Sequence, residues 1–295
     1  MDQIGLILWL QSFASPAMDR FWGLVTQAGS EEFFLLTMPI VYWCVDAALG
    51  LKFGLIFLAS AFLNGVFKDT LQLPRPPREQ VRVLLEETGG GFGFPSGHAQ
   101  NATVFWGFLA SQFRRRLWLA AAAIMIPAVG VSRIYLGLHW PTDVLGGIVI
   151  GLAILWLGQW AFSALPPVGR AASAHWQLIL ALAVPAVAFG LYSTDTSARI
   201  TGIALGLGLG YLGQVRWLGG SPIRGPFWQQ AVKVTVGVSL AFAIRVAVKP
   251  LLPDDLAFHF LRYALVGGWV SLGAPWVYKA AFDRRRAGNQ GRNKG

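Results

Sequence analysis

Residues 144–165 read VLGGIVIGLAILWLGQWAFSAL, an apolar stretch without a single charge. A helix needs about 20 such residues to cross the hydrocarbon core of a bilayer. Eight more largely apolar stretches occur along the chain, separated by polar breaks. The sequence therefore predicts an all-α, polytopic membrane helix bundle of about nine transmembrane helices. The predicted spans are 33–50, 51–67, 99–113, 117–136, 144–165, 176–191, 200–215, 227–248 and 258–278.

The composition excludes several classes of protein. Of the 295 residues, 55% are hydrophobic and 13% are charged, which is too apolar for a soluble domain. The net charge of +10 does not indicate a nucleic-acid partner, because the basic residues lie in loops at membrane boundaries. Cys44 is the single cysteine, so an intrachain disulfide is excluded, and we interpret it as a small apolar residue within a span.

The first 30 residues differ from the spans that follow. The apolar run 4–13 is too short to cross a bilayer, and Pro16 and charged residues come soon after it. Residues 1–30 are therefore predicted to form an N-terminal interfacial amphipathic helix. Met1-Asp2 provides no basic region, so a signal peptide is not expected.

The rest of the chain is divided by the polar break that follows residue 165. The predicted organisation is a core with all the reactive clusters at 31–165, an additional four-helix transmembrane region at 166–280, and a basic cytoplasmic tail at 281–295. Gly202, Gly206 and Gly210 recur at intervals of four residues, which lets another helix approach closely. We interpret these glycines as a packing surface.

The basic residues distinguish the two sides of the predicted bundle. If the nine spans alternate, one side receives Arg114-Arg115-Arg116 and the basic tail, and the positive-inside rule makes that side cytoplasmic. The loops 68–95 and 137–143 then face outward. The sequence thus predicts an integral protein of a bacterial inner membrane, with its reactive loops on the outer face.

Three separated segments on the outer side carry the reactive residues. They are KDTLQLPRP (68–76), PSGH (95–98) and SRIYLGLHWPTD (132–143). Charged groups near membrane depth usually line a polar cavity, so Lys68, Arg75 and Arg133 together indicate an anion site. The helix start after Pro95 offers free N–H groups and the Ser96 hydroxyl, which suit a phosphate. Taken singly, such residues would be head-group anchors or a helix N-cap.

His139 and Asp143 are four residues apart. Pro141 suits the first turn of the next helix, so His139 belongs to the entering loop and Asp143 to that first turn. The carboxylate can then bond one ring nitrogen, which fixes the tautomer and leaves the other nitrogen nucleophilic. A lone histidine beside Trp140 would be an interfacial residue, but the aspartate and the three cations favour a nucleophile.

The three segments resemble the three-part signature of the type 2 phosphatidic acid phosphatase superfamily. Every signature position is matched, and the resemblance covers about residues 33–165. It implies an integral-membrane phosphatase in which His139 attacks phosphorus to give a phosphohistidine, Asp143 orients His139, and His98 protonates the leaving oxygen. It also implies that the phosphoryl oxygens are held by Lys68, Arg75, Ser96, Gly97 and Arg133. Three fixed cations and a helix N-terminus can supply the charge stabilisation that phosphoryl transfer needs.

A metal cofactor is not expected at this site. His98 and His139 have only Asp143 as an obvious further ligand, and the three nearby cations would repel a divalent ion.

The remaining polar residues are interpreted as structural. His175 and His259 lie at other membrane boundaries, away from any evident cluster of charges, and we interpret them as interfacial. Asp46 and Asn64 lie within spans, where we expect them to make structural hydrogen bonds.

Several functions are compatible with these residues. The substrate is expected to be a lipid phosphate or diphosphate monoester in the bilayer, with undecaprenyl diphosphate, phosphatidic acid and phosphatidylglycerophosphate as candidates. A phosphotransferase from polyprenyl diphosphate to another lipid would use the same residues, and the nine spans are also similar to glucose-6-phosphatase, a sugar-phosphate phosphatase. The alternative outside enzymes is a lipid transporter or lipid-binding protein with a decayed site. The intact His98, His139 and Asp143 argue against that alternative.

Overall fold

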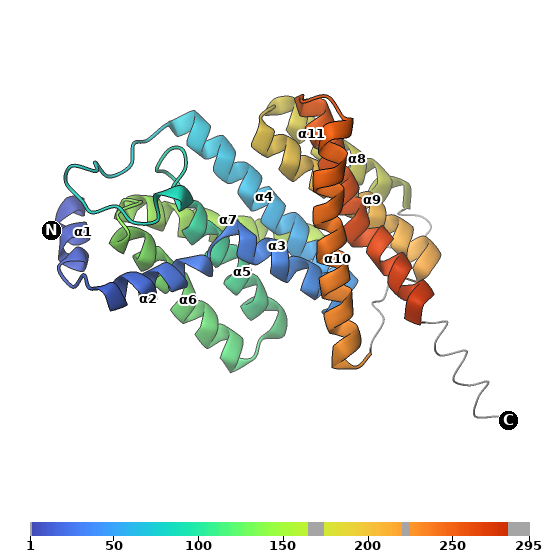
Figure 1. Cartoon of the computed structure of the whole chain (residues 1–295), viewed down its shortest axis with the longest axis horizontal. Helices are drawn as coiled ribbons and strands as arrows, with labels where there is room; N and C mark the ends of the chain where they lie inside the picture. Colours follow the sequence, from blue (N-terminus) through green and yellow to red (C-terminus); the bar gives the residue numbers. More distant parts are fainter. Residues whose placement is uncertain (1, 165–173, 220–224, 283–295) are drawn as a thin grey trace. The chain divides into compact units, whose positions relative to one another are not determined.

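The computed structural model describes residues 2–164, 174–219 and 225–282, which form helices joined by loops. No strand is assigned among these residues, so the predicted all-α class is confirmed. Four described helices are long and apolar enough to cross a membrane (Figure 1). They are α4 (Ala47–Leu71), α6 (Arg116–Tyr135), α7 (Pro141–Ala164) and the segment Phe227–Leu251. The chain is thus a membrane helix bundle, and the total of nine spans stays a prediction.

The chain separates into two compact units. One comprises Met1–Leu35 and Ile56–Ser163, and the other comprises Leu36–Leu55 and Ala164–Gly295. The predicted division at residues 30, 165 and 280 stays a prediction, and most of the predicted tail 281–295 lies outside the described residues.

The first unit holds the three reactive segments. Besides α6, α7 and the larger part of α4, it contains α1 (Gln3–Gln11), α2 (Pro16–Gln27), the start of α3 (Glu31–Ile40) and α5 (Gly97–Phe113). A long loop with one short 3-10 turn, Glu86–Thr88, connects α4 to α5.

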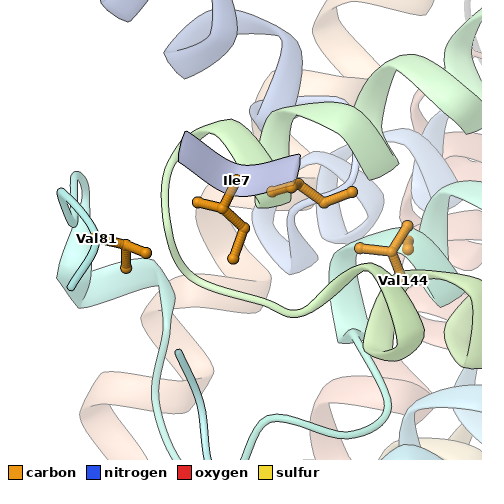
Figure 2. Close-up of a cluster of buried hydrophobic side chains, with 5 residues drawn as sticks. Ile7, Val81 and Val144 are labelled. Carbon is orange, nitrogen blue, oxygen red and sulfur yellow. The ribbon is translucent and has the colours of Figure 1, made fainter. Parts of the chain in front are cut away.

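Two helices stand where the sequence predicted one over residues 1–30. The hydroxyl of Ser15 accepts a 3.2 Å hydrogen bond from Met18 N, and Pro16 occupies the first helical position, so a new helix begins there. Ile7 of α1 is fully buried in a hydrophobic cluster with residues from the long loop, α5, α6 and α7 (Figure 2). The cluster consists of Ile7, Val81, Ala99, Ile134 and Val144. The N-terminal helices are therefore built into the first unit.

The predicted span 33–50 is interrupted at Asp46. A π-helical turn, Val41–Val45, follows α3, and Asp46 then has an extended backbone with φ −160° and ψ 130°. Its carboxylate accepts a 2.7 Å hydrogen bond from Leu49 N, which caps the start of α4. The side chain thus has the structural role expected of it, but it ends one helix and begins another.

The second unit is built from the later helices. It contains α8 (Ala174–Leu191), α9 (Asp195–Leu218), α10 (Phe227–Val248), the 3-10 turn Lys249–Leu251, α11 (Leu256–Gly268) and the π-helical turn Trp269–Gly273, and helical residues continue through 274–282. Side chains at Gly202 and Gly206 would overlap the carbonyl oxygens of Phe260 and Ala264 on α11. The predicted glycine packing surface of α9 is confirmed.

Candidate active site

The turn between α6 and α7 presents His139. Gly137 has a positive φ of 71°, and a Cβ atom there would overlap the carbonyl oxygen of Arg82, so the turn requires glycine. The next helix begins at Pro141, as the sequence predicted. These two residues fix the path of the backbone on either side of His139.

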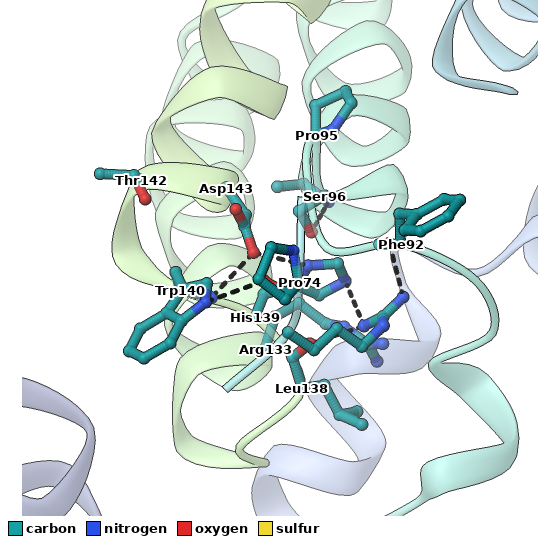
Figure 3. A network of polar contacts seen from close by, with 12 residues as sticks. Pro74, Phe92, Pro95, Ser96, Arg133, Leu138, His139, Trp140, Thr142 and Asp143 are labelled. Carbon is teal, nitrogen blue, oxygen red and sulfur yellow. Dashed lines mark hydrogen bonds and ion pairs between the residues drawn. The ribbon is translucent and has the colours of Figure 1, made fainter. Parts of the chain in front are cut away.

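His139 and Asp143 form a buried pair. Each residue is 2% exposed, and His139 Nδ1 lies 3.4 Å from Asp143 Oδ2, a long contact (Figure 3). The same carboxylate oxygen accepts a 2.9 Å hydrogen bond from Trp140 N. The indole of Trp140 donates in turn to the carbonyl oxygen of Pro74 at 3.0 Å. The carboxylate is thus held in place by the turn that carries the histidine.

Arg75 determines which nitrogen of His139 is available. Arg75 Nη1 lies 3.2 Å from His139 Nε2. A guanidinium group can only donate hydrogen bonds, so Nε2 must be the acceptor and the ring proton must lie on Nδ1, towards Asp143. The Nε2 lone pair therefore faces the cationic side of the site.

The long loop between α4 and α5 holds two of the cations. Arg75 donates to the carbonyl oxygens of Gly90 and Gly91 at 2.8 Å each and to that of Phe92 at 3.2 Å. Lys68 Nζ, in the last turn of α4, donates to the same Phe92 oxygen at 2.6 Å. Carbonyl oxygens carry no net charge, so these bonds fix the positions of the two groups without pairing either of them with an anion.

Arg133 is the third cation and is fully buried in α6. Its guanidinium donates to the hydroxyls of Thr26 and Thr88 at 3.0 Å each and to the Thr88 carbonyl oxygen at 2.9 Å. Its Nε is buried and has no hydrogen-bond partner among the residues that the structure describes. A buried donor of this kind is costly unless a ligand supplies an acceptor.

The start of α5 is tied to both neighbouring helices. Ser96 N donates to the Asp143 carbonyl oxygen at 3.0 Å, and the Ser96 hydroxyl caps α5 through a long 3.5 Å bond from Ala99 N. Asn64 of α4 donates to the carbonyl oxygen of Pro95 at 3.3 Å and to Gln100 Oε1 at 2.8 Å. Asn64 thus makes the structural hydrogen bonds that the sequence predicted.

Gly97 and His98 are the last two of the site residues that the sequence predicted. A Cβ atom at Gly97 would lie 3.3 Å from Asn64 Oδ1, so this position has little room for a side chain. His98 is half-buried and lies within the electrostatic field of the three cations. All eight residues that the sequence singled out are therefore in one site, while their individual roles stay predictions.

The cations also affect the protonation of His139. Burial lowers the pKa of His139 well below its ordinary value of 6.5, and the positive charges of Arg133, Arg75 and Lys68 lower it further. The imidazole is therefore neutral at physiological pH, as a nucleophile must be.

Thr26 and Thr88 are site residues that sequence reasoning missed. Thr26 lies 107 positions from Arg133 and belongs to α2, which was interpreted only as an interfacial helix. Neither threonine stands in a motif with the charged residues. The full burial of Thr26, evident only from the fold, is the signal that identifies it.

Comparison with known proteins gives two family matches. The model of the PAP2 superfamily matches residues 49–166, which include all eight site residues. The model of the PAP2 superfamily phosphatase transmembrane extension matches residues 198–285.

Curated proteins also match this chain. Sphingosine-1-phosphate phosphatase 2 of Homo sapiens is 32% identical over 142 residues, which are 45% of this chain and 36% of that protein. Phosphatidylglycerophosphatase B of Bacillus subtilis (strain 168) is 31% identical over 156 residues, which are 48% of this chain and 74% of that protein. The chain spans 36% to 41% of the length of three eukaryotic relatives that it matches.

One solved structure is similar. It is the first transmembrane PAP2 type phosphatidylglycerolphosphate phosphatase from Bacillus subtilis, which is 27% identical, with a TM-score of 0.48 over 57% of this chain and 87% of that chain.

Proposed function

The chain belongs to the PAP2 superfamily, and from this premise we propose that it is an integral-membrane phosphatase that hydrolyses a lipid phosphate or diphosphate monoester. The observation that carries the proposal is the Nε2 lone pair of His139, which faces Arg75 while Nδ1 faces Asp143. An acceptor nitrogen among fixed cations is suited to attack a phosphoryl group. The names of the curated relatives, which are lipid phosphate phosphatases, support the same class of substrate.

The first chemical step is proposed to form a phosphohistidine. The Nε2 lone pair attacks phosphorus, the N–P bond forms, and the bond from phosphorus to the lipid oxygen breaks. The cation that develops on the imidazole is stabilised by Asp143 beside Nδ1. A proton from His98 goes to the leaving oxygen, which departs as an alcohol or, from a diphosphate, as a phosphate.

His98 must carry a proton to act as this acid. In the free protein burial lowers the pKa of His98 well below 6.5, and the surrounding cations lower it further. A bound phosphate dianion brings two negative charges among those cations and so favours protonated His98. In the second step, water attacks phosphorus, the N–P bond breaks, and His98 takes the proton from the water.

Three cations are proposed to do the electrostatic work that a metal ion does in other phosphoryl-transfer enzymes. Lys68, Arg75 and Arg133 are already held by carbonyl and hydroxyl oxygens, so their positions require little reorganisation in the transition state. The unpartnered Nε of Arg133 can donate to a phosphoryl oxygen. We propose that the site opens on the outer face of the inner membrane, as the distribution of basic residues predicts.

Phosphate release in the presence of excess EDTA tests the reaction and its metal independence. We expect purified protein to hydrolyse at least one of phosphatidylglycerophosphate, phosphatidic acid, sphingosine 1-phosphate and undecaprenyl diphosphate at an unchanged rate, because the protein supplies the positive charge. Glucose 6-phosphate is the control without a lipid tail. Activity that EDTA removes and Mg²⁺ restores would contradict the metal-free mechanism, and hydrolysis of glucose 6-phosphate alone would contradict the lipid substrate.

Replacing Thr26 by valine is expected to lower kcat/KM about tenfold. Valine keeps the shape of the side chain but removes a hydroxyl that accepts a hydrogen bond from Arg133, and a bond to a charged group contributes about 1.5–3 kcal/mol. The measurement is the initial rate of phosphate release over a range of substrate concentrations. Thr70→Val, at an exposed position near the end of α4, is the matched control. Equal losses in the two variants would show that Thr26 does not position Arg133.

A further inference from the structure

Three arginines surround one tyrosine ring in the second unit. The guanidinium carbons of Arg199 on α9, Arg245 on α10 and Arg262 on α11 lie 6.0, 6.0 and 5.4 Å from the ring centroid of Tyr263. The ring itself is buried. Three helices thus place like charges around one ring, an arrangement that nearby negative groups stabilise.

The charges of this cluster are only partly balanced by protein groups. Arg199 lies 3.6 Å from Asp195, whereas no ion pair of Arg245 or Arg262 is recorded within the described part of the chain. Arg262 is only 7% exposed, and its buried Nε has no hydrogen-bond partner in the described part of the chain. As at Arg133, a buried guanidinium donor is left for a ligand.

The nearest carboxylates are engaged by a histidine. His259 Nδ1 lies 2.8 Å from Asp195 Oδ1, and His259 Nε2 lies 2.7 Å from Asp254 Oδ1. The interpretation of His259 as a residue away from any cluster of charges is therefore wrong, because α11 packs against α9 and brings His259 to Asp195. Each carboxylate thus gives one oxygen to His259, and Asp254 also lies within the electrostatic field of Arg262.

The cluster lies where helices end. Asp195 begins α9, α10 ends at Val248 with Lys249 directly after it, and α11 begins at Leu256. In a membrane protein, helix ends lie at the level of the lipid head groups. The phosphoryl group of a lipid head group is therefore the anion expected closest to the three arginines.

We propose that Arg199, Arg245 and Arg262 form a second anion site, which binds the phosphoryl group of a lipid head group or inorganic phosphate. Guanidinium groups match phosphate oxygens with paired donors, and basic pockets between membrane helices suit phosphorylated head groups. The site belongs to the second unit, whereas His139 and its cations belong to the first. Binding there involves no bond making or breaking, so it does not depend on the proposed phosphatase activity.

Native mass spectrometry of the detergent-solubilised His139→Ala protein tests the proposal, because a lipid phosphate is then bound but not hydrolysed. With dioleoyl phosphatidic acid we expect two adducts, one at each site, and no saturable adduct with dioleoylglycerol. The variant that adds Arg199→Gln and Arg245→Gln should weaken the second adduct by at least about tenfold. Both arginines are solvent-accessible, so these substitutions leave the buried Arg262 and the fold in place.

The control adds Arg115→Gln and Arg216→Gln, which remove two charges at exposed positions elsewhere. It should keep both adducts, and its thermal unfolding midpoint should equal that of the Arg199/Arg245 variant. Displacement of the second lipid by millimolar inorganic phosphate would identify free phosphate as a ligand, and resistance to displacement would identify the lipid head group. Phosphatidic acid binding that the Arg199→Gln and Arg245→Gln substitutions leave unchanged would overturn the proposal, whether or not the His139 site also binds this lipid.

Discussion

Replacing His139 by alanine is expected to lower kcat/KM by at least about 10⁴-fold, because the group that forms the covalent intermediate is lost. The same substitution should abolish acid-labile labelling of the protein by ³²P-labelled substrate. Rapid acid-sensitive, alkali-stable labelling of the wild-type protein during turnover is the positive result. Binding of a lipid phosphate to the His139→Ala protein, measured by native mass spectrometry, separates loss of the nucleophile from loss of substrate binding.

Two other histidines provide the comparisons for this experiment. His175→Ala should be without effect, since His175 is exposed at the start of α8. His98→Ala should slow turnover but still permit labelling when the substrate has a good leaving group, because such a group leaves without protonation. Retained turnover in His139→Ala would refute the assignment of the nucleophile.

The sequence predicted the composition of the site because its residues are chemically unusual in an apolar chain. Placing a charged side chain near the bilayer costs free energy, so the sequence rarely does it without a function. Lys68, Arg75 and Arg133 occur together with PSGH and His139, and this combination indicates an anion site. The first turn of α7 was also predictable, because Pro141 acts through local backbone geometry. Local backbone geometry and the free-energy cost of burying charge were thus enough to predict these features without the fold.

Contacts over long sequence separations were not predictable in this way. Thr26 and Thr88 are ordinary polar residues, and only the packing of α2 and the long loop against α6 brings their hydroxyls to Arg133. His259 is another case, because its two carboxylate partners lie on different elements. A hydroxyl or an imidazole can be exposed at a surface with little cost in free energy. Its position in the sequence therefore does not reveal which residues it will contact.

The predicted helix boundaries were wrong where a polar side chain caps a helix within an apolar stretch. Asp46 lies among apolar residues, so hydropathy alone continues the span through it. Its carboxylate nevertheless satisfies a free N–H group at the start of α4, which favours a new helix start over a continuous one. At the N-terminus, Ser15 and Pro16 have the same effect between α1 and α2.

Replacing Arg75 by glutamine is expected to lower kcat/KM about 10³-fold, the scale of losing an arginine that stabilises transferring phosphate. Arg75 is the cation whose nitrogen lies next to His139 Nε2, so it is placed to contact the phosphoryl group as it reaches that nitrogen. Glutamine keeps an amide donor but is shorter than arginine, so the substitution removes the charge together with part of the bonding to the loop. Arg78→Gln is the matched control, since Arg78 is an exposed neighbour paired with Glu86.

The same variant should change the pH dependence in a defined direction. Burial and the charges of Arg133, Arg75 and Lys68 hold the pKa of His139 below 6.5, so wild-type kcat/KM should fall only when the pH drops below that value. Removing the charge of Arg75 raises the pKa of His139, so the acid limb should move to higher pH. With one substrate for both proteins, ionisation of the substrate contributes equally to the two profiles. An acid limb at the same pH in both proteins would mean that Arg75 does not act on His139, and the nitrogen facing Arg75 would then not be the nucleophile.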